Sequence, residues 1–167
     1  MKLLNILFIP LLFLFFNCKS QTKESIYPTE KFSIIKGKLD DGKPIIGSIN
    51  TSYINYGHKA AYPWCLKINI ALDLKYVNEY GLPLKAESDT ANKFEDQLLS
   101  KIKKLATAHY VGHFYNDSFL DIYIYLEKPE NVHQFLQSEV NKPKLTRGFA
   151  YEIKKDPDWD IVKAYFK

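Results

Sequence analysis

The chain has 167 residues and a formal net charge of +4, with 23 Lys and Arg against 19 Asp and Glu. Its single arginine is Arg147, and its lysines are scattered along the chain. Proteins that bind nucleic acid usually present a clustered, arginine-rich basic stripe, so this composition argues against nucleic acid as a partner.

Residues 1–17 have the pattern of a signal peptide. Lys2 precedes an apolar stretch at 3–16, which is interrupted only by Asn5 and Pro10. As a helix this stretch would span about 21 Å at ~1.5 Å per residue, which is short of the roughly 30 Å hydrocarbon core of a membrane. An export signal is therefore favoured over a membrane-spanning helix.

Cys18 comes just after the apolar stretch, separated from it by Asn17 alone. This arrangement resembles a bacterial lipoprotein signal in which the cysteine becomes the acylated first residue. Bulky Phe16 and polar Asn17 depart from the usual small residues, so an ordinary secretory signal or an uncleaved anchor are the alternatives. Polar residues 18–30 would form a lipidated, flexible tether. Cys65 would then be the remaining thiol and could form no internal disulfide, so we expect it to be buried. The predicted location is the bacterial cell envelope, lipid-anchored to a membrane.

Residues 31–167 are predicted to form a single α+β domain. Two short aliphatic segments at 32–38 and 44–50 flank Asp40-Asp41-Gly42, a strong turn signal, and predict a β-hairpin. The segment 64–72 then alternates apolar and other residues with a period of two, as a strand with one buried face does.

A helix is predicted from residue 88 to 105, because apolar residues recur there at spacings of three and four. Ser88 or Asp89 could cap its start. Two strands at 107–115 and 119–126 follow on either side of an Asn-Asp-Ser turn.

The last third of the chain continues this alternation. Pro129 begins a second amphipathic helix that ends near Pro143, and 148–153 reads as a strand. Asp156 and Pro157 then start a short closing helix. From residue 64 the order is strand, helix, strand, strand, helix, strand, which predicts a ferredoxin-like split βαβ fold with an N-terminal hairpin and a short C-terminal helix.

The two closely spaced histidines, His109 and His113, could be a metal or catalytic pair. On a strand they would share a face but stand roughly 13 Å apart, at about 3.3 Å per residue. One zinc ion needs both nitrogens at about 2.1 Å, so an extended backbone excludes a shared metal. A helical turn would allow it, but Gly112 and the surrounding β-preferring residues favour a strand. No metal site, catalytic residue or cofactor is therefore predicted.

Alternation within 119–126 predicts a binding surface on the sheet. If its aliphatic residues face the helices, the intervening side chains face the other way, beside polar residues of the 64–72 strand. The candidate binding residues are Tyr123, Tyr125, Asp121, Lys67 and Asn69. The early hairpin could instead cover this face.

Several short motifs follow one another along the chain. They are Asp41-Gly42 with Pro44, Gly81-Leu82-Pro83, Phe94-Glu95-Asp96 with Leu98, Val111-Gly112, and Asp156-Pro157-Asp158-Trp159. Together they resemble the bacterial family called domain of unknown function 695, over roughly residues 32 to 166. The family implies no activity or site residues and supports mainly the fold. The pattern is also distantly similar to inhibitors of ribonuclease E, a cytoplasmic enzyme that an exported protein would not meet.

The favoured function is a non-enzymatic binding or protein-interaction module at the cell envelope, with an envelope protein as partner. One alternative is an envelope hydrolase that uses His109 or His113 as base, helped by Asp117 or Asp121. No Gly-x-Ser-x-Gly elbow or phosphate-binding glycine loop accompanies those residues. The other alternative is a homodimer that pairs through the same face.

Overall fold

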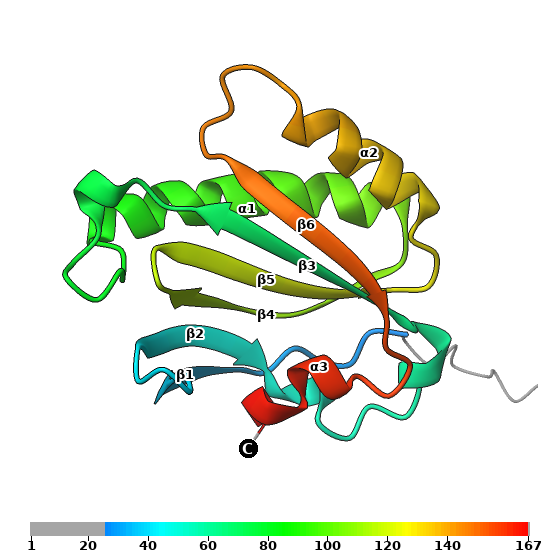
Figure 1. Cartoon of the computed structure of the whole chain (residues 1–167). Coiled ribbons are helices and arrows are strands. Elements are labelled where there is room, and N and C mark those ends of the chain that lie inside the picture. Colours follow the sequence, from blue (N-terminus) through cyan, green and yellow to red (C-terminus); the bar gives the residue numbers. More distant parts are fainter. Residues whose placement is uncertain (1–25, 167) are drawn as a thin grey trace, which may run out of the picture.

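A computed structural model describes residues 26–166 as a mixed α/β fold with a six-stranded antiparallel sheet and three α-helices (Figure 1). In the described part of the chain, no helix is both long and apolar enough to cross a membrane. The predicted signal peptide and Cys18 lie outside the described residues.

The sheet has the order β1-β2-β4-β5-β3-β6. The strands are β1 (Phe32–Lys38), β2 (Pro44–Asn50), β3 (Trp64–Ala71), β4 (Ala108–Asn116), β5 (Phe119–Leu126) and β6 (Phe149–Lys155). The helices are α1 (Lys85–Leu105), α2 (Glu130–Val140) and α3 (Asp160–Lys163).

The helices α1 and α2 cover one face of the sheet, because each carries an apolar stripe at helical spacing. In Figure 1 they lie on the same side of β3, β5 and β6. Their stripes pack on the alternating aliphatic residues of β3 and β5 to form the first core cluster. Its fully buried members are Leu66, Ile68, Ile70, Ala91, Ile102, Leu120, Ile122, Ile124, Leu126, Val132 and Leu136.

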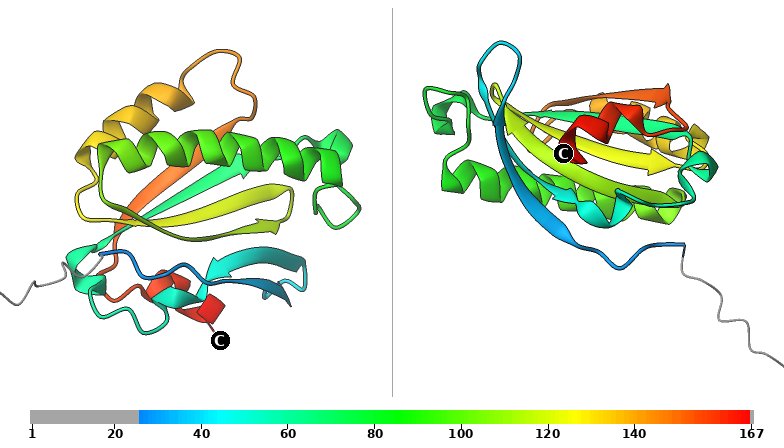
Figure 2. Two further views of the ribbon diagram at one scale, coloured as in Figure 1. Left: turned by 180° about the vertical axis from the view of Figure 1, so that it is seen from behind. Right: turned by 90° about the horizontal axis from the view of Figure 1, so that it is seen from below.

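The carboxyl-terminal segment covers the opposite face of the sheet. The right-hand view in Figure 2, seen from below, shows α3 lying across the strands on that side. Trp159 and Val162 of this segment pack on aromatic residues of β5 and of the loop that precedes β3. We call the result the second cluster; its buried members are Ile45, Ile49, Tyr53, Tyr62, Cys65, Val111, Phe114, Tyr123, Tyr125, Trp159 and Val162.

The hairpin β1–β2 extends the sheet instead of covering it, since β2 pairs with β4. Two glycines allow this close approach. A Cβ atom on Gly47 would lie 2.1 Å from the carbonyl oxygen of His113, and one on Gly112 would lie 2.3 Å from that of Ser48. Any side chain at either position would push β2 and β4 apart.

The predicted helix starts needed correction. α1 begins at Lys85, and its N-cap residue Leu84 makes no side-chain hydrogen bond, so Ser88 and Asp89 lie inside the helix and do not cap it. Pro129 occupies the cap position of α2 and is not its first helical residue. The last helix begins at Asp160 with Trp159 at its N-cap position, so Asp156 and Pro157 precede it. The carboxylate of Asp156 still accepts hydrogen bonds from the backbone N–H groups of Asp160 and Ile161, both at 3.0 Å.

Candidate functional site

A β-bulge separates the two histidines of β4. The backbone around them is extended as predicted, but the pairing register with β5 shifts between Tyr110 and Gly112. The extra residue turns His109 toward the second cluster and His113 toward the helices, so the prediction that they share a face is wrong. Among residues 26–166, no group of three or more His, Cys, Asp or Glu side chains could hold a metal ion.

His109 is fully buried in a cage of aromatic rings. Its Nδ1 shares a hydrogen bond of 3.2 Å with the hydroxyl of Tyr53, and its Nε2 has no partner within the described residues. Burial lowers the pKa of His109 to about 4, so the ring is neutral at physiological pH. A base sealed in this way cannot reach a substrate. The rings around it belong to Tyr27, Tyr53, Tyr56, Tyr62 and Trp159.

Tyr123 and Tyr125 were expected on an open face, but both side chains are buried. Tyr125 stacks on Trp159 with ring centroids 3.9 Å apart and donates a 2.5 Å hydrogen bond to Asp156. The hydroxyl of Tyr123 lies 3.3 Å from that of Tyr165. The carboxyl-terminal segment therefore occupies the surface that the alternation of β5 predicted to be free.

The three polar candidates do come together. Asp121 forms an ion pair of 2.9 Å with Lys67 and accepts a hydrogen bond of 2.6 Å from the side-chain amide of Asn69. Asn116 donates to the other carboxylate oxygen at 3.2 Å. Because these groups already satisfy one another, they offer a ligand few free hydrogen-bonding groups.

A groove lies between the hairpin and the start of α1. Residues that pair across antiparallel strands share a face, and Ile34, Ser48 and His113 are paired in one row across β1, β2 and β4. This row faces the same side as the helices. The cavity above it measures about 390 Å³, and we call it the His113 groove. Its lining residues are Ile34, Ile46, Gly47, Ser48, Asn78, Leu82, Pro83, Ser88, His113 and Tyr115.

Glu95 of α1 holds the imidazole of His113 in one orientation. Nδ1 of His113 lies 2.7 Å from one carboxylate oxygen of Glu95, and the hydroxyl of Tyr110 donates to the other at 2.8 Å. Glu95 is only 3% exposed, so these two donors replace the water it has lost. A carboxylate can only accept, which places a proton on Nδ1 and leaves Nε2 with no part in this contact. Burial, reinforced by the charge of Glu95, raises the pKa of Tyr110 and keeps this donor protonated.

The remaining polar groups of the groove are suited to binding. The hydroxyl of Tyr115 donates to the side-chain oxygen of Asn92 at 2.6 Å, while that of Ser48 has no hydrogen bond within residues 26–166. Ser48 lies opposite His113, yet no hydrogen bond joins the two side chains in this part of the chain. The pair lacks the nucleophile–base contact of a hydrolase and leaves both groups available to a ligand.

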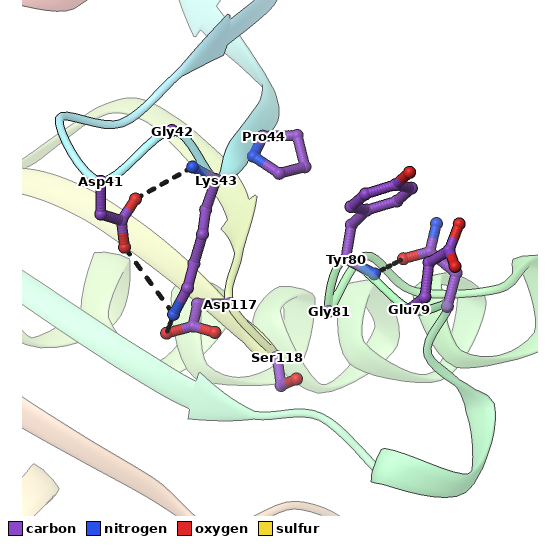
Figure 3. Close-up of a pocket in the computed structure, with 10 residues that line it drawn as sticks. Asp41, Gly42, Lys43, Pro44, Glu79, Tyr80, Gly81, Asp117 and Ser118 are labelled. Atoms are coloured by element: carbon purple, nitrogen blue, oxygen red, sulfur yellow. Dashed lines mark hydrogen bonds and ion pairs between the residues drawn. The ribbon is translucent and has the colours of Figure 1, made fainter.

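A second, more polar pocket of about 420 Å³ lies at the turn end of the hairpin and shares Asn78 with the His113 groove (Figure 3). Lys43 reaches from the hairpin turn to Asp117 at 2.6 Å and to Asp41 at 3.7 Å. Figure 3 shows Glu79 and Tyr80 across the pocket from this group. The charged side chains are about half exposed, so their pairing contributes little stability.

Glu95 is the residue that analysis of the sequence missed. In the sequence Glu95 stands out only as part of the Phe94-Glu95-Asp96 motif. A signal was present, since Glu95 adjoins Phe94 and Leu98 on the apolar stripe of α1. A carboxylate at the margin of a buried stripe needs a partner, and a histidine or tyrosine on the facing strand is the natural candidate.

A model of the family of unknown function DUF695 matches residues 34–166. No curated protein and no solved structure is detectably similar to the chain.

Proposed function

Since the chain belongs to the DUF695 family, whose description assigns no function, we propose from its geometry that it is a non-enzymatic binding module whose ligand occupies the His113 groove. One observation carries this proposal. The groove combines apolar walls with an imidazole that Glu95 holds in a fixed orientation. Ligand sites in proteins are typically concave and apolar, with a few convergent polar groups that set orientation.

We further infer that the core has the ferredoxin-like split βαβ topology. The chain order β3, α1, β4, β5, α2, β6 and the sheet order β4-β5-β3-β6 support this assignment. On this view β1–β2 is an addition at the β4 edge. The two helices cover the four core strands and leave the addition uncovered, which is how the groove arises.

The module is proposed to act at the cell envelope, anchored by lipid on Cys18. The support is the sequence alone: an apolar stretch too short to span a membrane, followed after one residue, Asn17, by cysteine. A Cys18→Ala variant should lose incorporation of labelled palmitate and leave the membrane fraction. Retention of the lipid label by this variant would contradict the proposal.

The groove can be tested by recovery of bound material from envelope extracts. Full-length protein in a mild detergent would be immobilised, and bound species identified by mass spectrometry. Ser48→Trp should fill the groove and lose the species that the unmodified protein retains. Ser33→Trp is the matched control, because Ser33 is exposed on the opposite face of β1. Equal recovery by the Ser48 variant would show that the ligand does not use the groove.

A hydrolase remains the second candidate, because the Glu95–His113 pair resembles a general base with its orienting carboxylate. Chromogenic carboxylic esters, phosphate esters and glycosides test it directly. We expect no turnover above background. Turnover that falls about a hundredfold in His113→Gln would establish the enzyme and overturn the non-enzymatic proposal.

A further inference from the structure

Among residues 26–166, strand β1 is an edge of the sheet and pairs only with β2, so its outward backbone groups pair with no described strand. Backbone hydrogen bonds run from Leu39 N–H to the Lys43 carbonyl (2.8 Å) and from Thr51 N–H to the Lys31 carbonyl (2.7 Å). They show that the odd-numbered residues at this edge direct their N–H and C=O groups toward β2. Because this pattern alternates along an antiparallel pair, the even-numbered residues of β1 direct their N–H and C=O groups outward. These residues are Phe32, Ile34, Lys36 and Lys38.

The same residues direct their side chains toward the His113 groove. Ile34 is 73% exposed and lines the groove, and Phe32 is 45% exposed and packs against Tyr110 at a ring-centroid distance of 6.1 Å. At the other edge, β6 differs, because its apolar side chains pack against the first core cluster and Tyr151 contacts His133 of α2. At β1 an added strand would instead find the uncovered apolar side chains of the strand itself beside the His113 groove.

Charge on this edge selects the partner. Lys36 and Lys38 are exposed and form no ion pair within residues 26–166. A second copy of the chain pairing through β1 would bring its own lysines beside them, and like charges on adjacent strands are destabilising. A strand with acidic residues at these positions would neutralise both.

We propose that the ligand of the His113 groove is an extended peptide that adds to β1 as a seventh strand, with alternating residues that are first acidic and then apolar. Antiparallel pairing places its acidic side chains beside Lys38 and Lys36 and its apolar ones beside Ile34 and Phe32. Main-chain hydrogen bonds supply affinity, and the side chains directed toward the groove supply specificity. This inference rests on the proposed function, since it assigns a ligand class to the same site.

The test uses the full-length chain in a nonionic detergent and the labelled peptide Glu-Thr-Glu-Thr-Val-Thr-Val. Fluorescence anisotropy should show binding that weakens about fivefold when lysine replaces both glutamates, the loss expected for two exposed charge pairs at ~0.5 kcal/mol each. N-methylation of the first valine should also weaken binding, because it removes the N–H that would bond β1 at Ile34 and keeps the side chain. A charge preference that is absent, or equal binding of the N-methylated peptide, would overturn the proposal.

A charge exchange on the protein sharpens the result. Lys36→Glu combined with Lys38→Glu should reverse the preference, so that the lysine peptide binds more tightly than the acidic one. Lys93→Glu with Lys104→Glu is the matched control, because both lysines are exposed on α1 and make no ion pair within the described residues. Reversal in the control double variant would show a general charge effect and overturn the assignment to β1.

Amide exchange separates this inference from the proposed function. The peptide should protect the outward amides of Phe32, Ile34, Lys36 and Lys38 and leave those of β6 unchanged. If the peptides fail while Ser48→Trp still abolishes capture from extracts, the ligand class is wrong but the groove stands. If both experiments fail, the groove itself is not the binding site.

Discussion

His109 and His113 lie in the same strand, yet one is sealed among aromatic rings and the other faces a groove. The two environments differ in what covers the sheet. On the face that carries His109, Trp159 of the carboxyl-terminal segment covers the sheet. On the face that carries His113, α1 lies over the core strands and leaves the hairpin β1–β2 uncovered. One extra residue at the bulge decides which environment each ring enters.

The difference separates a stabilising role from a binding role. His109 hydrogen-bonds Tyr53 and is buried without a second partner, so it contributes through packing. His113 is held by a buried carboxylate, which fixes the ring while its other nitrogen remains available. Variants on the closed side should therefore change stability, and variants on the groove side should change binding.

The largest expected effect follows from removal of the Trp159 side chain. Trp159→Ala loses the stack on Tyr125 and two hydrogen bonds of 3.1 Å from its indole N–H to the carbonyl groups of Lys59 and Tyr62. The free energy of unfolding should fall by about 4 kcal/mol, as for other buried large-to-small changes. Chemical denaturation measures this.

Leu74→Ala is the control, because Leu74 is 72% exposed and should change stability by no more than about 0.5 kcal/mol. An equally small loss in Trp159→Ala would show that the closing segment does not hold the second cluster together.

The pH dependence of stability should be the next largest effect, and His109 should cause it. Its folded-state pKa of about 4 lies below the ordinary value of 6.5, so the unfolded chain binds more protons between these two values. Stability should therefore be highest above pH 6.5 and fall as the pH drops toward 4. Between pH 7 and pH 5 the loss from this group is about 2 kcal/mol.

Denaturation of His109→Phe at the same two pH values isolates this contribution. The variant should lose about 2 kcal/mol less than the unmodified protein on going from pH 7 to pH 5. The comparison uses the change with pH and not the absolute stability, so any packing cost of phenylalanine cancels. Identical pH dependence in both proteins would show that His109 is not buried as a neutral ring.

Much of the fold was predictable because its periodicities are local. The period of two in β3 and β5 and the helical spacing in α1 and α2 depend only on which residues are apolar. The bulge at Val111 had one local signal, Gly112, because a glycine inside a strand often marks a bulge or a close backbone approach, but this signal does not distinguish between the two. A period of two likewise shows that Tyr123 and Tyr125 share a face, but not which distant segment covers that face.

The candidate site was predictable only in part, for a related reason. The sequence named His113 only as a base for the alternative hydrolase and placed the binding surface elsewhere. The partner of His113 lies on α1, and the pairing of Glu95 with His113 depends on how the helix docks across the sheet. The groove depends on a still longer-range feature, the pairing of β2 with β4, which relies on Gly47 and Gly112. Asp117 and Asp121, proposed as helpers from nearby sequence, pair instead with Lys43 and Lys67.

The smallest expected effect on stability belongs to Glu95→Gln, which tests the groove side directly. Glutamine can still accept from the Tyr110 hydroxyl, but its amide would donate toward His113 and favour the tautomer with the proton on Nε2. We expect a loss of about 1 kcal/mol in stability. Nitrogen-15 chemical shifts of the His113 ring should report the exchange of tautomers, and capture of the groove ligand from extracts should fall with it.

Glu152→Gln is the matched control, because Glu152 is exposed on β6 and pairs with Lys154 at 2.6 Å. If the ring nitrogens of His113 keep their shifts in Glu95→Gln, then Glu95 does not set its tautomer, and the groove loses the feature that distinguishes it from an ordinary surface hollow.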